Sequence, residues 1–120
     1  YTSVVLPVLE YGSIIWHANI TEEQIHQLES IKRRAVRIID PNESESDKKL
    51  QPLVERREVL SKRFFNSLMQ PSNCLHNILP APRNRITTEK LRHANNYPTP
   101  FAKTERFKRS FIVHAMANYQ

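Results

Sequence analysis

Glycine is almost absent from this chain, since Gly12 is the only one among 120 residues. One glycine cannot make a glycine-rich phosphate loop in its usual form, and it leaves no Asn-Gly or Asp-Gly turn of the kind that favours β-hairpins. The apolar residues instead recur with a period near 3.6, which is the period of an α-helix. The sequence therefore predicts a mainly helical fold.

Other features in short supply exclude further classes. The single Cys74 excludes an intrachain disulfide, and with His76 it supplies only two neighbouring ligands where a structural zinc site needs four. The most apolar stretch, residues 4–16, is interrupted by Pro7 and Glu10 and is too short to span a bilayer. We therefore expect no metal site, no cofactor in this segment and no membrane contact, and an intracellular location in the nucleus or cytoplasm.

Charge is unevenly distributed along the chain. Residues 1–31 carry four glutamates and no Lys or Arg, a local charge of −4, although the whole chain has a formal net charge of +6. Residues 56–120 hold twelve Lys or Arg against three Glu. This basic part is typical of a protein that binds a polyanion, and a merely solvated basic surface is the alternative.

The helical pattern predicts a small bundle of about four to five helices in one domain. Because residue 1 is Tyr rather than Met, we expect the domain to belong to a longer protein. An extended, proline-containing basic arm should separate a helical core from a terminal helix. The expected ranges are helices at 2–16, 21–39, 52–69 and 73–79 within core 1–79, a polar loop at 40–51, the arm at 80–106 and the last helix at 107–120.

The second expected helix has the clearest start. Thr21 and Gln24 stand at capping-box spacing, and Pro41 follows the expected end near residue 39. Arg33 lies one turn after Glu29 and can pair with it inside the helix, whereas Arg34 and Arg37 have no such partner. The apolar residues should form a core-facing stripe: Ile25, Leu28, Ile31, Ala35, Ile38 and Ile39.

The third expected helix carries an arginine within its apolar face. Arg57 falls among residues such as Leu53 and Phe64, whereas Arg56 and Arg63 lie beside that face. An unpaired buried charge is costly, so we predict a structural role for Arg57, paired with an acidic group such as Glu10 or Asp40, with RNA contact as the alternative. The aromatic residues of the last helix, from Phe107 onward, should dock on the core, with base stacking as the alternative.

Three blocks in fixed order resemble a known family. They are Val-Val-Leu-Pro-Val-Leu-Glu-Tyr-Gly at 4–12 running to Trp16, Leu-Glu-Ser-Ile-Lys-Arg-Arg-Ala at 28–35, and Leu-Val-Glu-Arg-Arg at 53–57. Arg83, the segment 98–106, Ser110-Phe111 and Ala115 continue the order. Together they resemble the post-palm, thumb-like region of non-LTR (LINE-like, jockey-type) retrotransposon reverse transcriptases. The family often ends its last helix with Trp-Asn, where this chain has Tyr119-Gln120.

The resemblance implies a role without chemistry in this segment. In that family the catalytic carboxylates lie upstream in a Tyr/Phe-x-Asp-Asp turn, and the parent polymerase uses Mg²⁺. This chain has no adjacent Asp-Asp pair. The expected partners are the RNA or RNA:DNA hybrid backbone and the upstream palm domain. The expected phosphate contacts are Lys32, Arg34, Arg37, Arg56, Lys62, Arg63, Arg83 and Arg85.

Other functions stay open. The apolar first helix, with Tyr11 and Trp16, could serve as a docking surface of a protein-interaction module. A helix-turn-helix DNA-binding domain is disfavoured, because a loop of about twelve residues is longer than that motif's turn of about three or four. A decayed transposon relic without activity is a further alternative.

Overall fold

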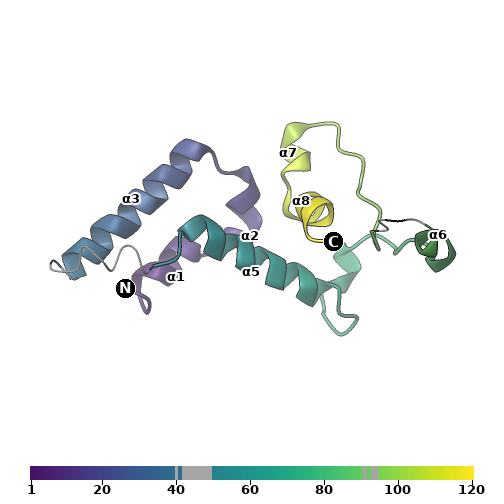
Figure 1. The fold of residues 1–120 in the computed structure, drawn as a ribbon, viewed down its shortest axis with the longest axis horizontal. Helices are drawn as coiled ribbons and strands as arrows, with labels where there is room; N and C mark the ends of the chain where they lie inside the picture. The colour runs from purple at the N-terminus through teal and green to yellow at the C-terminus, as the bar shows by residue number, and fades with distance from the viewer. Residues whose placement is uncertain (40, 42–49, 91, 93–94) are drawn as a thin grey trace. The chain divides into compact units, whose positions relative to one another are not determined.

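The computed structural model describes residues 1–39, 41, 50–90, 92 and 95–120. The predicted mainly helical fold is confirmed, and the described residues contain no strand. Short 3₁₀ turns occur at His17–Asn19 and His76–Ile78. The α-helices, labelled in Figure 1, are α1 (Val5–Glu10), α2 (Ser13–Trp16), α3 (Glu22–Ile39), α5 (Leu53–Leu68), α6 (Arg85–Glu89), α7 (Glu105–Lys108) and α8 (Phe111–Asn118).

The chain divides into two compact units, Tyr1–Leu60 and Ser61–Gln120. In the first unit Leu6 and Leu9 of α1 are buried with Leu53 at the start of α5. In the second unit a larger apolar cluster joins the end of α5 to α8. Its buried members are Phe65, Leu68, Leu79, Tyr97, Ala115 and Met116. The expectation of a single domain stays a prediction.

The first expected helix is broken into α1 and α2 at the only glycine. Gly12 has a φ of +61°, in the left-handed region that favours glycine. The indole Nε1 of Trp16 then donates a hydrogen bond of 2.9 Å to the carbonyl of Tyr11. The apolar pattern across residues 2–16 predicted one continuous helix, because a periodicity does not report the backbone angles of a single residue.

The start and end of α3 agree with the sequence. The amide of Thr21 donates to the side chain of Gln24 at 2.9 Å, and the amide of Gln24 donates back to the Thr21 hydroxyl at 3.3 Å. This is the predicted capping box, and the helix ends at Ile39 as expected. The predicted polar loop at 40–51 lies mostly outside the described residues.

The buried face of α3 differs from the predicted stripe. Ile25, Leu28 and Ala35 are half-buried, but the fully buried side chains of the helix are Lys32 and Val36. The remaining members of the stripe, Ile31, Ile38 and Ile39, are exposed. The buried face of α3 is therefore rotated about the helix axis relative to the predicted stripe. The prediction used only apolar residues, whereas Lys32 is buried because its ammonium has hydrogen-bond partners inside the protein.

Helix α5 runs from Leu53 to Leu68, one residue inside the predicted start at Pro52 and the predicted end near Met69. Its buried positions recur every three or four residues, which places them on one face of the helix. The face includes Arg57, as predicted, and it also includes Ser61, which was not predicted to be buried. Its buried residues are Leu53, Arg57, Ser61, Phe65 and Leu68.

The C-terminal third differs in detail from the expected arm and terminal helix. The expected helix at 73–79 is reduced to the 3₁₀ turn His76–Ile78. The arm contains α6. The side chain of Asn84 caps the start of this helix by accepting a hydrogen bond from the Ile86 amide. The terminal helix is divided into α7 and α8, since Ser110 is extended and its hydroxyl donates to the Phe107 carbonyl at 2.7 Å. The Asn84 side chain thus starts a helix within the expected arm, whereas the Ser110 hydroxyl bonds to a backbone carbonyl at the point where the terminal helix divides.

Candidate nucleic-acid interface

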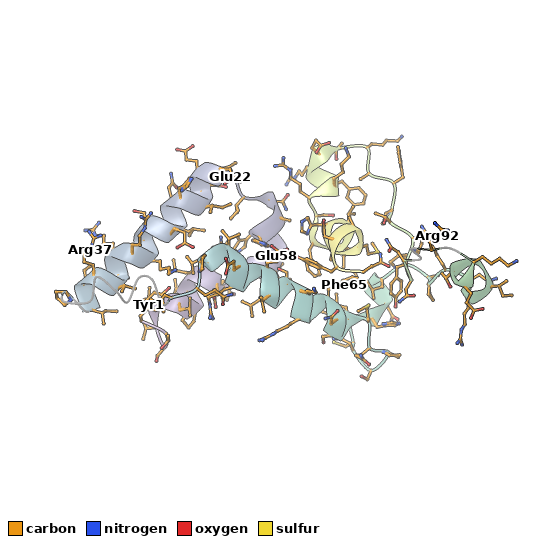
Figure 2. The ribbon with its side chains drawn as sticks, in the orientation of Figure 1. Tyr1, Glu22, Arg37, Glu58, Phe65 and Arg92 are labelled. Atoms are coloured by element: carbon orange, nitrogen blue, oxygen red, sulfur yellow. The ribbon has the colours of Figure 1, made fainter. Side chains whose placement is uncertain are left out.

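The exposed arginines of α3 form the basic surface of the first unit. Arg34 and Arg37 are both exposed, and neither has an ion pair with any residue that the structure describes. Figure 2 labels Arg37 near the C-terminal end of the helix. Their spacing of three residues puts the two side chains on neighbouring positions of the helix surface. As far as the described residues go, both are therefore available to contact an anion.

Arg33 does not form the predicted ion pair with the Glu29 carboxylate. Its Nε donates to the Glu29 carbonyl at 3.5 Å, a weak contact. The Glu29 carboxylate is used elsewhere. Its Oε1 accepts from the backbone amide of Leu53, and its Oε2 lies 3.4 Å from the Lys32 ammonium.

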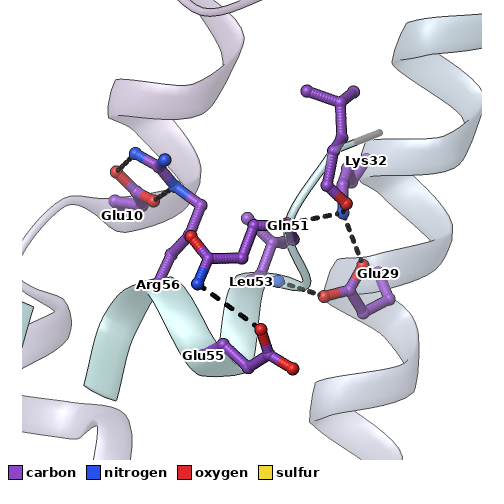
Figure 3. A network of polar contacts seen from close by, with 8 residues as sticks. Glu10, Glu29, Lys32, Gln51, Leu53, Glu55 and Arg56 are labelled. Atoms are coloured by element: carbon purple, nitrogen blue, oxygen red, sulfur yellow. Dashed lines mark hydrogen bonds and ion pairs between the residues drawn. The ribbon is translucent and has the colours of Figure 1, made fainter. Parts of the chain in front are cut away.

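Lys32 was predicted to contact phosphate, and the structure requires a correction. The residue is 4% exposed, and its ammonium donates to the carbonyls of Gln51 at 3.0 Å and Leu50 at 3.4 Å (Figure 3). With the ion pair to Glu29, these contacts use all three donors of the ammonium. Lys32 therefore joins α3 to the residues that lead into α5 and cannot reach a phosphate in this arrangement.

Arg56 is also engaged inside the protein. Its Nε lies 2.6 Å from Oε1 of Glu10, and a second nitrogen donates to Oε2 at 3.4 Å, which ties α5 to α1 (Figure 3). The hydrogen bond to Glu10 raises the pKa of Arg56 above its usual value. The guanidinium keeps some exposure, and its charge is compensated by Glu10. A contact of Arg56 with phosphate stays a prediction.

Arg57 is buried as predicted, and the predicted ion pair with Glu10 is not observed. Glu10 pairs with the neighbouring Arg56, and Asp40 lies outside the described residues. The side chain is 0% exposed, and its three nitrogens have no hydrogen-bond partner among the residues described. The guanidinium carbon lies 5.3 Å from the ring centroid of Trp16, a cation–π distance. Burial lowers the pKa of Arg57, and the charges of Glu29 and Glu10 oppose this shift.

Lys62 and Arg63 are the predicted contacts on the second half of α5. Both are exposed, and neither makes an ion pair within the described part of the chain. They follow the buried Ser61 and precede the buried Phe65, so the core sets the side of the helix on which they lie. Their contact with nucleic acid stays a prediction.

Arg83 and Arg85 are brought together around one open hollow in the second unit. The hollow has a volume of about 390 Å³. Arg83 is exposed, and Arg85 makes an exposed i,i+4 ion pair with Glu89 at 3.3 Å. An exposed pair of this kind contributes little, about 0.2–1 kcal/mol. Sequence reasoning selected both arginines but not Asn96 and Tyr97, which line the same hollow, since only the fold brings these residues near Arg83.

A second surface was recognised only in outline from the sequence. Four apolar side chains of the segment from Val4 to Ile15 are 72–84% exposed. Every exposed residue of positions 1–21 is uncharged, because the only charged residue there, Glu10, is half-buried and bound to Arg56. We call the exposed residues of positions 1–21 the uncharged face. Its apolar members are Val4, Val8, Tyr11 and Ile15.

No group of three or more His, Cys, Asp or Glu side chains is placed to hold a metal ion in the parts of the chain that the structure describes. Cys74 is exposed, and Nδ1 of His76 lies 2.7 Å from the Leu68 carbonyl, which fixes that ring on the backbone. No helix in the described ranges is both long and apolar enough to cross a membrane. A comparison of the chain with known protein families, with curated proteins and with solved structures finds no match.

Proposed function

We propose that this chain is the thumb-like, non-catalytic segment of a retrotransposon-derived RNA-directed DNA polymerase, and that it grips the backbone of RNA or an RNA:DNA hybrid. The proposal starts from the ordered sequence blocks at 4–16, 28–35 and 53–57. The catalytic carboxylates and the Mg²⁺ ions belong, in this proposal, to the upstream polymerase core. The segment itself needs only correctly placed positive charge and works inside the cell.

The observation that carries the proposal is the pair of exposed arginines on α3. Arg34 and Arg37 have no acidic partner among the described residues, and the opposite side of the helix is anchored through Lys32 and Val36. An anchored helix presents its arginines at fixed positions, and phosphate contacts need only such positive charge at a helix surface. Lys62 and Arg63 offer a similar exposed pair in the second unit.

The uncharged face supports the second expected partner, the upstream palm domain. An apolar surface without a single exposed charge does not attract the phosphate backbone, which binds through Lys and Arg. It has instead the character of a protein interface, whose centre is depleted of charged residues. The same face favours a protein-interaction module as the alternative function.

The proposal is tested by the salt dependence of RNA binding. Replacing Arg34 and Arg37 with Gln should reduce the slope of log affinity against log salt by about 0.7–0.9 per residue. The reason is that each phosphate contact releases counterions when the complex forms, and each replacement removes one such contact. The weakening should be similar for different RNA sequences. Fluorescence anisotropy of a labelled RNA:DNA hybrid, titrated at several salt concentrations, measures the slope.

A matched control is the replacement of Arg106 and Arg109 with Gln. It removes the same charge from exposed positions that are not among the predicted contacts. We expect its slope to match that of the unmodified chain. Equal slopes for all three proteins would remove Arg34 and Arg37 from the interface, and no measurable hybrid binding by the unmodified chain would contradict the proposed function.

A further inference from the structure

The hollow beside α6 combines basic and apolar walls in one place. Its volume of about 390 Å³ lies within the range of small-molecule sites, about 300–1,000 Å³. Basic and polar side chains line part of it, and apolar or aromatic side chains line the rest. The lining residues are Met69, Pro82, Arg83, Arg85, Thr88, Asn96 and Tyr97.

The apolar wall is built on the core of the second unit. Tyr97 is buried in the same cluster as Phe65 and Met116. Its backbone is held at the end of α8, because its amide donates to Oε1 of Gln120 at 2.8 Å and its carbonyl accepts from Nε2 of Gln120 at 3.3 Å. Gln120 in turn donates to the Met116 carbonyl at 2.6 Å. The wall is therefore anchored to a helix and does not depend on a free loop.

The basic wall is fixed by its backbone. The amide of Arg83 donates to the carbonyl of Asn96 at 2.8 Å, which holds the segment before α6 against the residues that lead to Tyr97. Arg85 and Thr88 lie one turn apart on α6, so their side chains share a face of that helix. The Thr88 hydroxyl donates to the Arg85 carbonyl at 2.9 Å. Both arginines line the hollow.

The charges at this hollow favour an anion. The carboxylate that the structure places on Arg85 is that of Glu89, and the two side chains are 91% and 67% exposed. An ion pair so accessible to water is readily exchanged for a better acceptor. Phosphate is such an acceptor, because guanidinium groups bind its oxygens through two parallel hydrogen bonds. Met69, Pro82 and the small exposed part of the largely buried Tyr97 give an apolar lining that suits the planar group of a base.

We infer that this hollow binds a single nucleotide of a nucleic-acid strand, with the phosphate at Arg83 and Arg85 and the base against the wall of Met69, Pro82 and Tyr97. The inference rests on the proposed function, since it names the nucleotide unit that this part of a nucleic-acid-binding chain recognises. The amide side chain of Asn96 at the same hollow offers a donor and an acceptor to a base edge.

The test is a titration of the whole chain, labelled with ¹⁵N, by adenosine 5′-monophosphate, adenosine and inorganic phosphate. We expect saturable NMR shifts of the Arg83, Thr88 and Tyr97 amides with the nucleotide, and at least several-fold weaker binding of adenosine or phosphate alone. Replacing Arg83 and Arg85 with Gln should weaken nucleotide binding about tenfold or more. The control R106Q/R109Q, with the same change of charge, should bind the nucleotide as the unmodified chain does.

Three outcomes overturn the inference. The first is an unchanged nucleotide affinity in R83Q/R85Q, and the second is nucleotide-induced NMR shifts spread evenly over exposed Lys and Arg residues. The third is equal affinity for phosphate and nucleotide, which would mean that the hollow binds an anion without recognising a base. The hybrid-binding measurement separates this inference from the proposed function. Hybrid binding without saturable nucleotide binding contradicts the hollow alone, whereas nucleotide binding without hybrid binding contradicts the proposed function and leaves a free-nucleotide site.

Discussion

At the scale of single residues, the contrast between Arg56 and Arg57 is the most informative. The two are adjacent on α5, yet Arg56 is bound to Glu10 and Arg57 is buried without a hydrogen bond to a described residue. Removing a charge from water costs several kcal/mol. The cation–π contact with Trp16 returns only about 0.5–2 kcal/mol. Arg57 thus stabilises the fold mainly by filling space in the core, and its charge contributes little.

We therefore expect Arg57→Met to keep or raise the free energy of unfolding. A methionine fills a similar volume without a buried charge, and even a buried ion pair can be replaced by apolar residues of similar volume with a neutral or stabilising effect of about 1–4 kcal/mol. Arg57→Ala should instead lose about 2–5 kcal/mol, because it leaves a cavity. Urea unfolding followed by circular dichroism measures both, and hybrid binding should not change. A methionine variant as unstable as the alanine variant would show that the guanidinium has an anionic partner outside the described residues, such as Asp40.

At the scale of elements, one glutamate of α3 organises the start of α5. Glu29 accepts a hydrogen bond from the Leu53 amide, one of the amides at a helix start that have no partner within the helix, and it also pairs with the buried Lys32 (Figure 3). A charged acceptor at a helix N-terminus also interacts favourably with the helix dipole. The contact thus joins two helices that are separated by thirteen residues in the sequence.

Replacing Glu29 with Ala should lower the free energy of unfolding of the first unit by about 2–3 kcal/mol, because it leaves both a helix-start amide and a buried ammonium without their charged partner. Amide hydrogen exchange of Leu53, measured by NMR, should become much faster. Gln27→Ala, at an exposed position of the same helix, serves as the control and should change neither value. Retained protection of the Leu53 amide in the Glu29 variant would disprove the capping role.

At the scale of the whole molecule, charge and apolar surface are segregated along the chain. The basic residues belong mostly to positions 56–120, whereas the exposed residues of positions 1–21 are uncharged. A contiguous apolar patch on a protein surface marks an interaction site or an aggregation liability. In the proposed polymerase the palm domain covers the uncharged face, so the chain without that domain should self-associate through it.

Replacing Val8 and Ile15 with Gln should keep the chain monomeric at concentrations where the unmodified chain self-associates, because both side chains are more than 70% exposed on the uncharged face. Size-exclusion chromatography with light scattering measures the mass, and circular dichroism checks that helicity is kept. Phe101→Ser, which removes an equally exposed apolar side chain from the second unit, is the control and should behave as the unmodified chain. Self-association that persists in V8Q/I15Q would exclude this face as its cause.

The sequence alone determined the helical class, the capping box at Thr21 and Gln24, the start of α5 to within one residue and the burial of Arg57. These depend on local spacing and backbone chemistry, which are written in consecutive residues. Only the tertiary structure decided that Lys32 and Arg56 are used internally, that Ile31 is exposed, and that Arg83 and Arg85 share a hollow with Tyr97. These contacts depend on which residues from distant parts of the sequence pack against each side chain. The helical period sets the angle between side chains along one helix, but it does not determine the residues on other elements that contact them.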